Sequence, residues 1–330
     1  MFKGKKILFF SANFFGYQYE IKNKLVELGA KVDFFDERPK NTFLYKSLIR
    51  FNRRFVRRTI ERYYRAIIEK TKTTDYDFVF FLKAEAITLK VLKELQQNQK
   101  KARFILYMWD SIDHFPEVRK LFPVFDKILS FDKEDVAENS FLHFRPLFYI
   151  DTYKELPDKP KEHKNDIAFI GTAHLDRYPV LMKLRDYCKS NDIKNYFFIY
   201  LQDLKIYYIR KLLFKSFRKS KKSDFELIPL NKDQIKTIIT NTMCVLDIEK
   251  KIQTGLTMRA IETLGARRKL ITTNPSIKEY DFYDENNIFI LDRKNPILNA
   301  EFMKKEYKKV NQDVYIKYSL EHWLIDIFKD

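Results

Sequence analysis

The sequence predicts an α/β protein made of two doubly wound domains, each with a parallel sheet covered by helices on both faces. Three observations carry this prediction. A strand, a glycine turn, a helix and a second strand follow one another in residues 6–35, and the same succession recurs from residue 166. Between the two copies lies a polar stretch with two prolines, residues 154–164, which is typical of an interdomain linker. A further strand, glycine loop, helix and strand occupies residues 245–274.

Length and composition favour the same two-domain organisation. The chain has 330 residues, of which 45% are hydrophobic and 16% aromatic, enough for two packed cores. It contains no run of about 18 uncharged apolar residues, and the apolar run after Lys6 is too short for a signal peptide. The two cysteines predict no disulfide framework and suit a reducing compartment. We therefore expect a cytoplasmic protein.

In the first half, five apolar runs of strand length alternate with stretches of helical spacing. The expected strands are 6–11, 31–35, 77–82, 104–108 and 128–130. The expected helices are 18–28, 49–67 and 88–97, and the first ends at Gly29, a residue that commonly caps a helix. No GxGxxG follows the first strand, so a dinucleotide fingerprint is absent here.

The net charge of +18 is concentrated in two segments. Residues 46–72 hold ten Lys and Arg against two Glu, and residues 205–222 hold eight Lys and Arg and no acid. The first segment has helical periodicity, with an apolar stripe opposite an arginine face. The stripe is Ile49, Val56, Ile60, Tyr63 and Ile67, and the arginines are Arg54, Arg57, Arg58, Arg62 and Arg65. This face is either simply solvated or meets anionic lipid headgroups or a polyanionic substrate.

The fourth expected strand ends in a polar and aromatic run, Trp109-Asp110-Ser111-Ile112-Asp113-His114. Side chains at the carboxyl end of a parallel strand lie where open α/β sheets bind ligands. Asp110, Asp113 and His114 are the candidates for a general base that takes the proton of an acceptor hydroxyl. Asp110 is the first choice because it lies at the strand end beside Trp109. The alternative is that these side chains cap the following turn.

The second half repeats the alternation. The expected strands are 166–170, 196–200, 225–229, 245–248, 269–273 and 288–291, and the expected helices include 179–188, 232–241 and 313–328. We expect an N-terminal domain at 1–153, a linker at 154–164, a C-terminal domain at 165–312 and a terminal helix within 313–330 that packs back on the first domain. The second basic segment mixes apolar residues with its cations. Those taken as facing a membrane or an acceptor are Arg210, Lys211, Lys215 and Arg218.

The strand, glycine loop, helix and strand at residues 245–274 resemble part of a known protein family. The run from Gln253 to Gly265, QTGLTMRAIETLG, resembles the donor-binding helix of GT-B glycosyltransferases, in which a glycine loop precedes a helix with a glutamate. Within that fold, the chain resembles the CgeB-like glycosyltransferases of bacterial surface-polysaccharide loci. That group also has a Trp-Asp-Ser strand end, as at 109–111, and a Phe-Ile-Gly opening to its second domain, as at 169–171. Thr254 departs from the commoner pattern of two glutamates eight residues apart. The resemblance implies two Rossmann-like domains facing a cleft, the GT-B arrangement.

The resemblance also implies how a nucleotide sugar is bound. Glu262 would accept hydrogen bonds from the ribose hydroxyls, because a carboxylate offers acceptors only and can take two hydroxyls at once. Backbone amides of Gly255, Leu256 and Thr257 at the helix start would bind the diphosphate. Arg259 would neutralise charge on the leaving diphosphate. The plain alternative is that Arg259 and Glu262 are a solvated pair one turn apart.

A second glycine, Gly171, follows an apolar run that opens the second domain. If this run is the first strand of its sheet, Gly171, Thr172 and Arg177 face the donor as well. The glycine would let the backbone approach the phosphates and Thr172 would donate a hydroxyl hydrogen bond. Alternatively, the glycine only allows a turn.

These observations predict a glycosyltransferase that moves a sugar from a nucleotide-sugar donor to a lipid-linked or surface-glycan acceptor of the lipopolysaccharide or capsule type. We expect it at the inner face of the plasma membrane, where its basic segments meet an anionic surface. The donor is a substrate, so no cofactor is expected, and no metal either, because no isolated Asp-x-Asp ends a strand. The rivals are a nucleic-acid-binding protein, favoured by pI ≈ 9.5 but not by any recognisable motif, and an inactive GT-B scaffold of a synthase complex.

Overall fold

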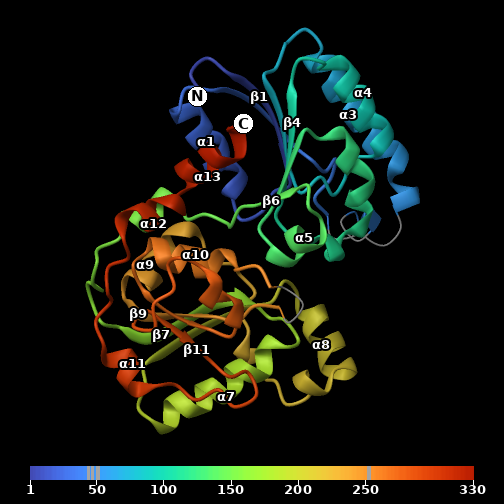
Figure 1. Cartoon of the computed structure of the whole chain (residues 1–330). Coiled ribbons are helices and arrows are strands. Elements are labelled where there is room, and N and C mark those ends of the chain that lie inside the picture. Colours follow the sequence, from blue (N-terminus) through green and yellow to red (C-terminus); the bar gives the residue numbers. More distant parts are fainter. Residues whose placement is uncertain (43–44, 46–47, 50–52, 251–253) are drawn as a thin grey trace. The chain divides into compact units, whose positions relative to one another are not determined.

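The computed structural model describes residues 1–330 except 43–44, 46–47, 50–52 and 251–253 (Figure 1). It divides the chain into two compact units. The first comprises Met1–Pro146 and Leu320–Asp330, and the second comprises Leu147–Ser319. This division places residues 147–164, including the stretch expected to be a linker, inside the second unit.

The first unit is built on a parallel sheet of six strands in the order β2-β1-β3-β4-β5-β6. The strands are β1 (Lys6–Ser11), β2 (Lys31–Asp36), β3 (Phe78–Leu82), β4 (Arg103–Met108), β5 (Lys127–Ser130) and β6 (Leu142–Phe144). β1, β3 and β4 are almost entirely buried, which explains their unbroken apolar runs, because a parallel sheet is covered on both faces. The five predicted strands are confirmed within one or two residues, and β6 was missed because only three residues pair.

Helices cover both faces of this sheet. They are α1 (Tyr17–Glu27), α3 (Arg57–Thr71), α4 (Leu89–Asn98), α5 (Lys133–Glu138) and α13 (Leu320–Phe328). α1 and α13 pack together on one face, and α3 and α4 lie on the other (Figure 1). Two 3-10 segments, Ile112–His114 and Pro116–Val124, follow β4.

The second unit has a parallel sheet of five strands in the order β11-β10-β9-β7-β8. The strands are β7 (Asn165–Thr172), β8 (Asn195–Tyr200), β9 (Thr242–Asp247), β10 (Lys269–Thr272) and β11 (Ile288–Ile290). The helices are α6 (Asp151–Lys154), α7 (Arg177–Ser190), α8 (Leu204–Leu213), α9 (Lys232–Thr240), α10 (Met258–Gly265), α11 (Ala300–Lys304) and α12 (Gln312–Lys317). α7 covers one face of the sheet, and α9 and α10 cover the other (Figure 1). Two doubly wound parallel sheets confirm the predicted fold class.

Two predicted elements of this half are wrong. Residues 225–229 form no strand: Glu226 makes one isolated bridge to Tyr200, and the apolar Ile228 is 81% exposed. The predicted helix 313–328 is two helices, because α12 ends at Lys317 and α13 begins at Leu320 in the other unit. The helix of the second basic segment ends at Leu213, and the remaining cations lie in short 3-10 turns and loops.

Gly265 anchors α10 by close packing. A Cβ atom at this position would lie 2.4 Å from the Tyr149 Cγ atom, so no other residue allows the ring to approach the helix end so closely. The Tyr315 hydroxyl donates a hydrogen bond to the Gly265 carbonyl at 2.7 Å, and the Tyr149 hydroxyl donates to the Tyr315 carbonyl at 3.0 Å. The C-terminal end of α10 is thereby fixed, which also fixes where its N-terminus points.

Candidate functional site

The strand order of the second sheet locates a ligand site. The chain leaves β7 towards β8 on one side and leaves β9 towards β10 on the other. Ligands of open α/β sheets bind outside the carboxyl ends of the strands where the strand order reverses in this way. The site is therefore expected at the loops that follow β7 and β9.

Three elements bring charged groups to this point. Asp247 is the last residue of β9, Arg177 is the first residue of α7, and Arg259 lies in the first turn of α10. Burial raises the pKa of Asp247 to about 6, opposed by the nearby charges of Arg177 and Arg259 and by a hydrogen bond with the Thr257 side chain. Thr257 is the N-cap of α10, and its hydroxyl accepts from the Ala260 amide at 3.1 Å.

Several guanidinium donors at this edge are buried and have no hydrogen-bond partner among the described residues. These are Nε of Arg177 and both Nε and Nη1 of Arg259. Arg259 Nη1 lies 2.8 Å from Glu262 Oε2, an ion contact whose angles are not those of a hydrogen bond. Burial lowers the pKa of Arg177, which shows that its charge is held against a desolvation cost. Unsatisfied buried donors beside a helix N-terminus suit an anion with several oxygens.

The charges at this edge also affect the ionisation of His174. Its pKa falls to about 4, first because the ring is buried and next because Arg177 and Lys250 are close. The imidazole is therefore neutral at physiological pH, and cations outweigh the nearby Asp176 carboxylate. This edge of the sheet favours a bound anion.

An ion cluster holds the loops around the site together. Arg293, in the loop after β11, contacts Glu249 Oε1 at 2.6 Å and Asp176 Oδ2 at 2.9 Å. The Thr273 hydroxyl donates to Glu249 Oε2 at 2.5 Å. The loops after β7, β9, β10 and β11 are thus linked through two carboxylates and one guanidinium. Sequence reasoning missed Asp247, Glu249 and Arg293, although acids directly after a buried-type strand were a signal for the first two.

The predicted donor-binding residues all lie at or near this edge. Gly171 and Thr172 are inside β7 rather than after it, and a Cβ at Gly171 would lie 2.7 Å from the Phe169 ring, so this glycine makes room for a side chain. The Arg177 Nη1 atom reaches the Thr172 hydroxyl at 3.5 Å. Gly255 and Leu256 are buried in the loop before α10, and Gln253 falls outside the described residues.

Glu262 is not a solvated residue. Its side chain lies on the buried face of α10 and is 1% exposed, and burial raises its pKa well above the usual range. Arg259 is the cation beside it. The alternative that Arg259 and Glu262 form a solvated surface pair is therefore wrong, because Glu262 is buried. The two side chains are nevertheless in contact.

The first sheet has its own strand-order reversal, between β1 and β3. Lys83 follows β3 in a left-handed conformation, with φ 83°, and its ammonium group contacts Asp110 Oδ2 at 2.5 Å. Ala84 is also left-handed, with φ 54°, so this turn holds two non-glycine residues in a strained region. Trp109 packs edge-on against Phe14 with ring centroids 5.4 Å apart. Asp110 is thus placed at the ligand edge of the sheet beside a cation and an aromatic cluster.

The two other candidates for the base lie elsewhere. Asp113 and His114 are exposed in the 3-10 turn after β4. Asp113 contacts Arg119 at 3.2 Å. Ser111 donates to Asp132, and the Ile112 amide donates to Asp135 at 3.1 Å, so this loop is held by carboxylates of the next strand connection. The structure therefore brings only Asp110 to the sheet edge.

A cluster of buried charged side chains lies in the segments that follow β2 and β3 of the first sheet. Arg38 forms an ion pair with Glu85, and the Glu85 amide donates to Glu37 Oε2 at 3.1 Å. Glu37 is fully buried, and its second carboxylate oxygen has no partner among the described residues. Burial, the largest cause, raises the pKa of Glu37 to about 7 in spite of the neighbouring Arg38 charge. Sequence reasoning did not single out this cluster.

This raised pKa predicts a pH dependence of stability. The folded pKa of Glu37 lies above its ordinary value of 4.5, so its contribution is fully present below pH 4.5 and is lost as pH rises through 7. We expect the free energy of unfolding to fall by about 3 kcal/mol from this group between pH 4.5 and 8, since each pKa unit corresponds to about 1.4 kcal/mol. In Glu37→Gln this loss should be absent, as measured by urea unfolding at several pH values. The exposed Glu138→Gln is the control, and a Glu37→Gln variant with an unchanged pH slope would contradict the assignment.

The basic residues separate into two kinds. On α3, Ile60, Tyr64 and Ile67 are buried, whereas Tyr63 of the predicted stripe is only partly buried. The five predicted arginines are exposed, four of them on α3 and Arg54 in the 3-10 turn before it. Two of these are partly neutralised, since Arg57 contacts Glu61 at 2.8 Å and Arg65 contacts Glu94 at 2.9 Å. In the second segment Lys215 and Arg218 are exposed, whereas Arg210 and Lys211 are bonded inward. Of the four cations predicted to face a membrane or an acceptor, Arg210 and Lys211 are therefore half-buried and bonded to the protein.

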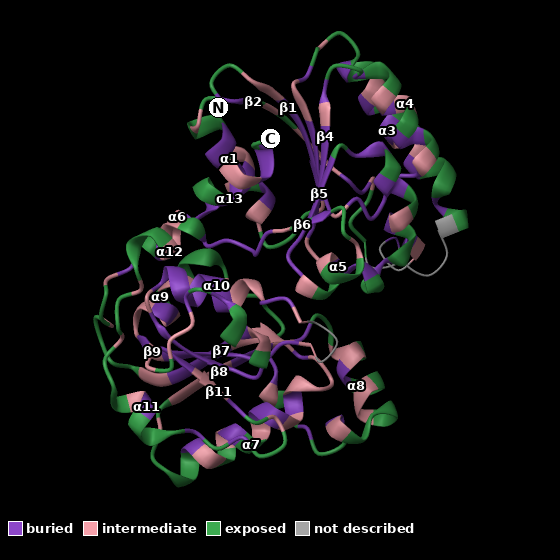
Figure 2. Cartoon of the chain, in the orientation of Figure 1, coloured by how far each residue is buried: buried purple, intermediate pink, exposed green. Residues whose placement is uncertain are grey.

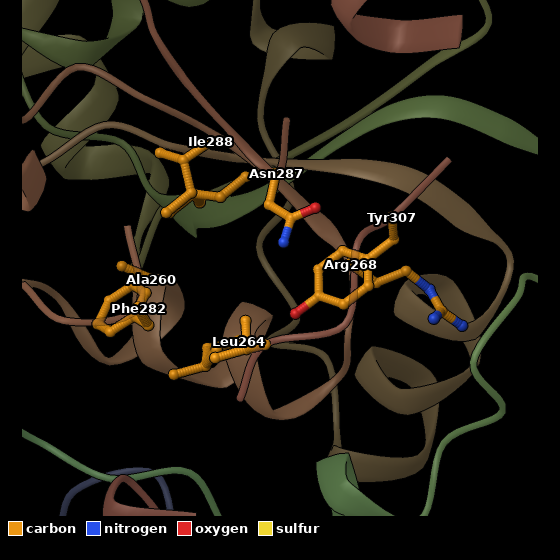
Figure 3. Close-up of a pocket in the computed structure, with 9 residues that line it drawn as sticks. Ala260, Leu264, Arg268, Phe282, Asn287, Ile288 and Tyr307 are labelled. Carbon is orange, nitrogen blue, oxygen red and sulfur yellow. The ribbon is translucent and has the colours of Figure 1, made fainter. Parts of the chain in front are cut away.

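A cavity of about 10 Å³ lies beside α10, lined by Ala260, Leu264, Phe282 and Tyr307 among others (Figure 3). Its volume is that of about one water molecule. It is mainly apolar and cannot hold a nucleotide. Within the described residues, no group of three or more His, Cys, Asp and Glu side chains is placed to hold a metal ion.

Comparison with known proteins identifies the fold. No family model matches the chain, and no curated protein matches its sequence. A trehalose-phosphate synthase (UDP-forming) from Burkholderia xenovorans superposes with a TM-score of 0.62 at 10% identity, covering 98% of each chain. The apo form of the lipopolysaccharide outer core galactosyltransferase WaaB gives 0.51 at 14% identity, also over 98% of each chain. A UDP-GlcNAc 2-epimerase from Methanocaldococcus jannaschii gives 0.54 at 11% identity, over 97% of this chain and 99% of that one. The fold is that of GT-B glycosyltransferases, shared at this level of identity with an epimerase.

Proposed function

We propose that the protein is a glycosyltransferase that takes a sugar from a nucleotide-sugar donor. The observation that carries the proposal is the set of buried guanidinium donors of Arg177 and Arg259 at the β7–β9 edge that have no hydrogen-bond partner among the described residues. A nucleoside diphosphate offers the oxygens that these donors lack, and it places negative charge at the N-terminus of α10. The relatives of similar fold include a UDP-forming transferase, which supports the same class of donor.

In this proposal each donor residue has one task. The amides of Gly255, Leu256 and Thr257 and the Arg177 guanidinium hold the diphosphate. Arg259 neutralises the charge that builds on the leaving diphosphate as the bond to the sugar breaks. Glu262 accepts hydrogen bonds from the ribose hydroxyls, and its Oε2 atom lies 2.8 Å from Arg259 Nη1. Gly171 and Thr172 line the neighbouring strand end.

The acceptor side of the proposal rests on the first unit. An inverting transfer needs a base, and Asp110 would take the hydroxyl proton of the acceptor while the acceptor oxygen attacks the sugar carbon and the nucleoside diphosphate leaves. A retaining transfer needs no such base. We propose a lipid-linked or surface-glycan acceptor at the inner face of the plasma membrane, as in the CgeB-like group that the sequence resembles. The fold similarity to a lipopolysaccharide galactosyltransferase supports this class.

Release of nucleoside diphosphate tests the proposal. The full chain is incubated with a panel of nucleotide sugars, with and without crude lipid-linked glycan, and free nucleotide is measured. A transferase releases nucleotide faster when the acceptor is present. Epimerisation, the rival chemistry of the same fold, would instead convert the donor sugar without any acceptor. Nucleotide binding without turnover of either kind would indicate an inactive scaffold.

A further inference from the structure

Helix α8 exposes an apolar outer face although its inner face is apolar as well, since Tyr207 is buried and Ile206 packs against the core. Its outer face carries Tyr208, Ile209, Leu212 and Leu213, which are 58%, 55%, 78% and 64% exposed. The spacing i, i+1, i+4, i+5 places these four side chains on one side of the helix. Phe214, directly after the helix, is exposed as well. Figure 2 shows α8 at the margin of the second unit with its exposed residues outward.

Two of the three cations of the helix, Arg210 and Lys211, are bonded on the inner face, whereas Lys205 is exposed. The Arg210 guanidinium donates to the Ala173 carbonyl and lies over the Phe217 ring, and burial lowers its pKa. Lys211 donates to the Tyr207 hydroxyl at 3.1 Å and to the Ser220 carbonyl at 3.0 Å. These bonds fix the rotation of the helix about its axis. The exposure of the leucines is therefore a consequence of specific contacts on the other side.

Exposed positive charge borders the apolar face. No acidic residue occurs from residue 204 to residue 223. Six cations of this stretch are exposed: Lys205, Lys215, Arg218, Lys219, Lys221 and Lys222. A helix with a large exposed apolar face and a basic border has the composition of an interfacial membrane helix, and the absence of acids fits an anionic surface.

We propose that the outer face of α8 docks on an anionic lipid bilayer, with Leu212 and Leu213 inserted among the acyl chains and the surrounding lysines and arginine at the phosphate groups. No helix among those that the structure describes is long and apolar enough to cross a membrane, so this surface would lie on the bilayer. Apolar insertion and charge attraction act together here, since either signal alone gives only marginal binding.

The helix is coupled to the proposed donor site through Arg210. Ala173, whose carbonyl accepts from Arg210, is the first residue after β7, next to His174 in the loop that leads to Arg177. Docking of α8 would therefore hold the donor-binding edge close to the lipid surface. This role in presenting a lipid-linked acceptor rests on the proposed function, whereas lipid binding itself does not.

Vesicle co-sedimentation tests the proposal. The full chain should bind vesicles of phosphatidylcholine mixed with phosphatidylglycerol, bind pure phosphatidylcholine weakly, and lose affinity at high salt. In the double variant Leu212→Ser/Leu213→Ser the partition coefficient should fall by at least about tenfold, because two leucine side chains no longer leave water. The variant should keep its Tm, since both residues are exposed. Lys215→Glu/Arg218→Glu tests the charge separately and should weaken binding only to anionic vesicles.

Ile297→Ser is the matched control, because Ile297 is an exposed aliphatic residue of the same unit, 51% exposed, outside α8. It should bind vesicles like the unmodified chain. Failure of the unmodified chain to bind anionic vesicles overturns the proposal, and so does equal binding by the double-serine variant. A dimer that the serines dissociate, without vesicle binding, would assign the face to a second copy of the chain and likewise overturn it. Nucleotide binding is measured independently, so failure here leaves the proposed transfer reaction standing.

Discussion

Arg177→Ala and Arg259→Ala should each lower kcat/KM for the nucleotide sugar by about 10²- to 10³-fold, the range found when one preorganised donor to a developing anion is removed. Both guanidinium groups have buried N–H donors that lack a hydrogen-bond partner among the described residues. Arg177 should affect KM as well as kcat, because it would hold the diphosphate before and during transfer. Arg259 should act mainly on kcat, because its task is the charge of the leaving group. Initial-rate kinetics of nucleotide release measure both.

Lys189→Ala is the control for these two variants. Lys189 is an exposed cation near the end of α7, the helix that begins with Arg177. Its removal changes the net charge equally but should leave kcat/KM within about twofold, since an exposed charge is screened by solvent. The apo Tm of each variant is measured alongside to show that the domain remains folded. Full activity in a folded Arg177→Ala protein would remove this residue from the donor site.

Asp110→Asn should lower kcat by about 10²- to 10⁴-fold if transfer is inverting, which is the usual contribution of a general base. Asp113→Asn and His114→Ala should leave kcat nearly unchanged, because both residues are exposed in a turn away from the strand end. The three residues are neighbours in sequence, and Asp110 was the first choice because of its place at the strand end. The structure adds that Asp113 and His114 are exposed in the following turn.

Steady-state kinetics with saturating donor and varied acceptor measure this difference. The unmodified chain should lose activity on the acid side as its base is protonated, and that limb of the pH profile should be missing in Asp110→Asn. Unchanged activity in Asp110→Asn would show that no base from this loop takes part, as expected for a retaining transfer. A large loss of activity in His114→Ala instead would assign the role of the base to His114.

Most strands of both sheets, and the fold class, followed from the sequence because the relevant signals were local. Runs such as KILFFS and FILYM have too little polarity for any position other than a strand covered on both faces, and glycine turns marked where helices begin. The prediction failed where strand formation depended on residues distant in the sequence. FELIP has strand composition, but the sheet edge beside it offers only one bridge, so Leu227 and Ile228 remain exposed.

Parts of the candidate site could also be read from the sequence. A helix that starts near Thr257 and carries Arg259 was expected from the sequence, and the structure adds that Thr257 is its N-cap. The partners of Asp247 and Glu249 could not, because Arg177 and Arg293 come from loops far along the chain. The second basic segment shows the same limit. Its composition indicated a membrane surface, but which residues face outward depends on the inward bonds of Arg210 and Lys211.

The claim that the β7–β9 edge binds a nucleoside diphosphate is tested most directly by ligand-induced thermal stabilisation. The apo chain is heated with UDP, GDP, CDP, ADP and dTDP, with the matching nucleosides as controls, and so is the Arg177→Ala/Arg259→Ala variant. At about 100-fold excess over Kd a ligand stabilises the folded state by about 2.7 kcal/mol, a shift of a few degrees in Tm. We expect at least one diphosphate to raise the Tm, its nucleoside to do so much less, and the double variant to show no shift. If no nucleoside diphosphate changes the Tm of the unmodified chain, the site is not a nucleotide-sugar site.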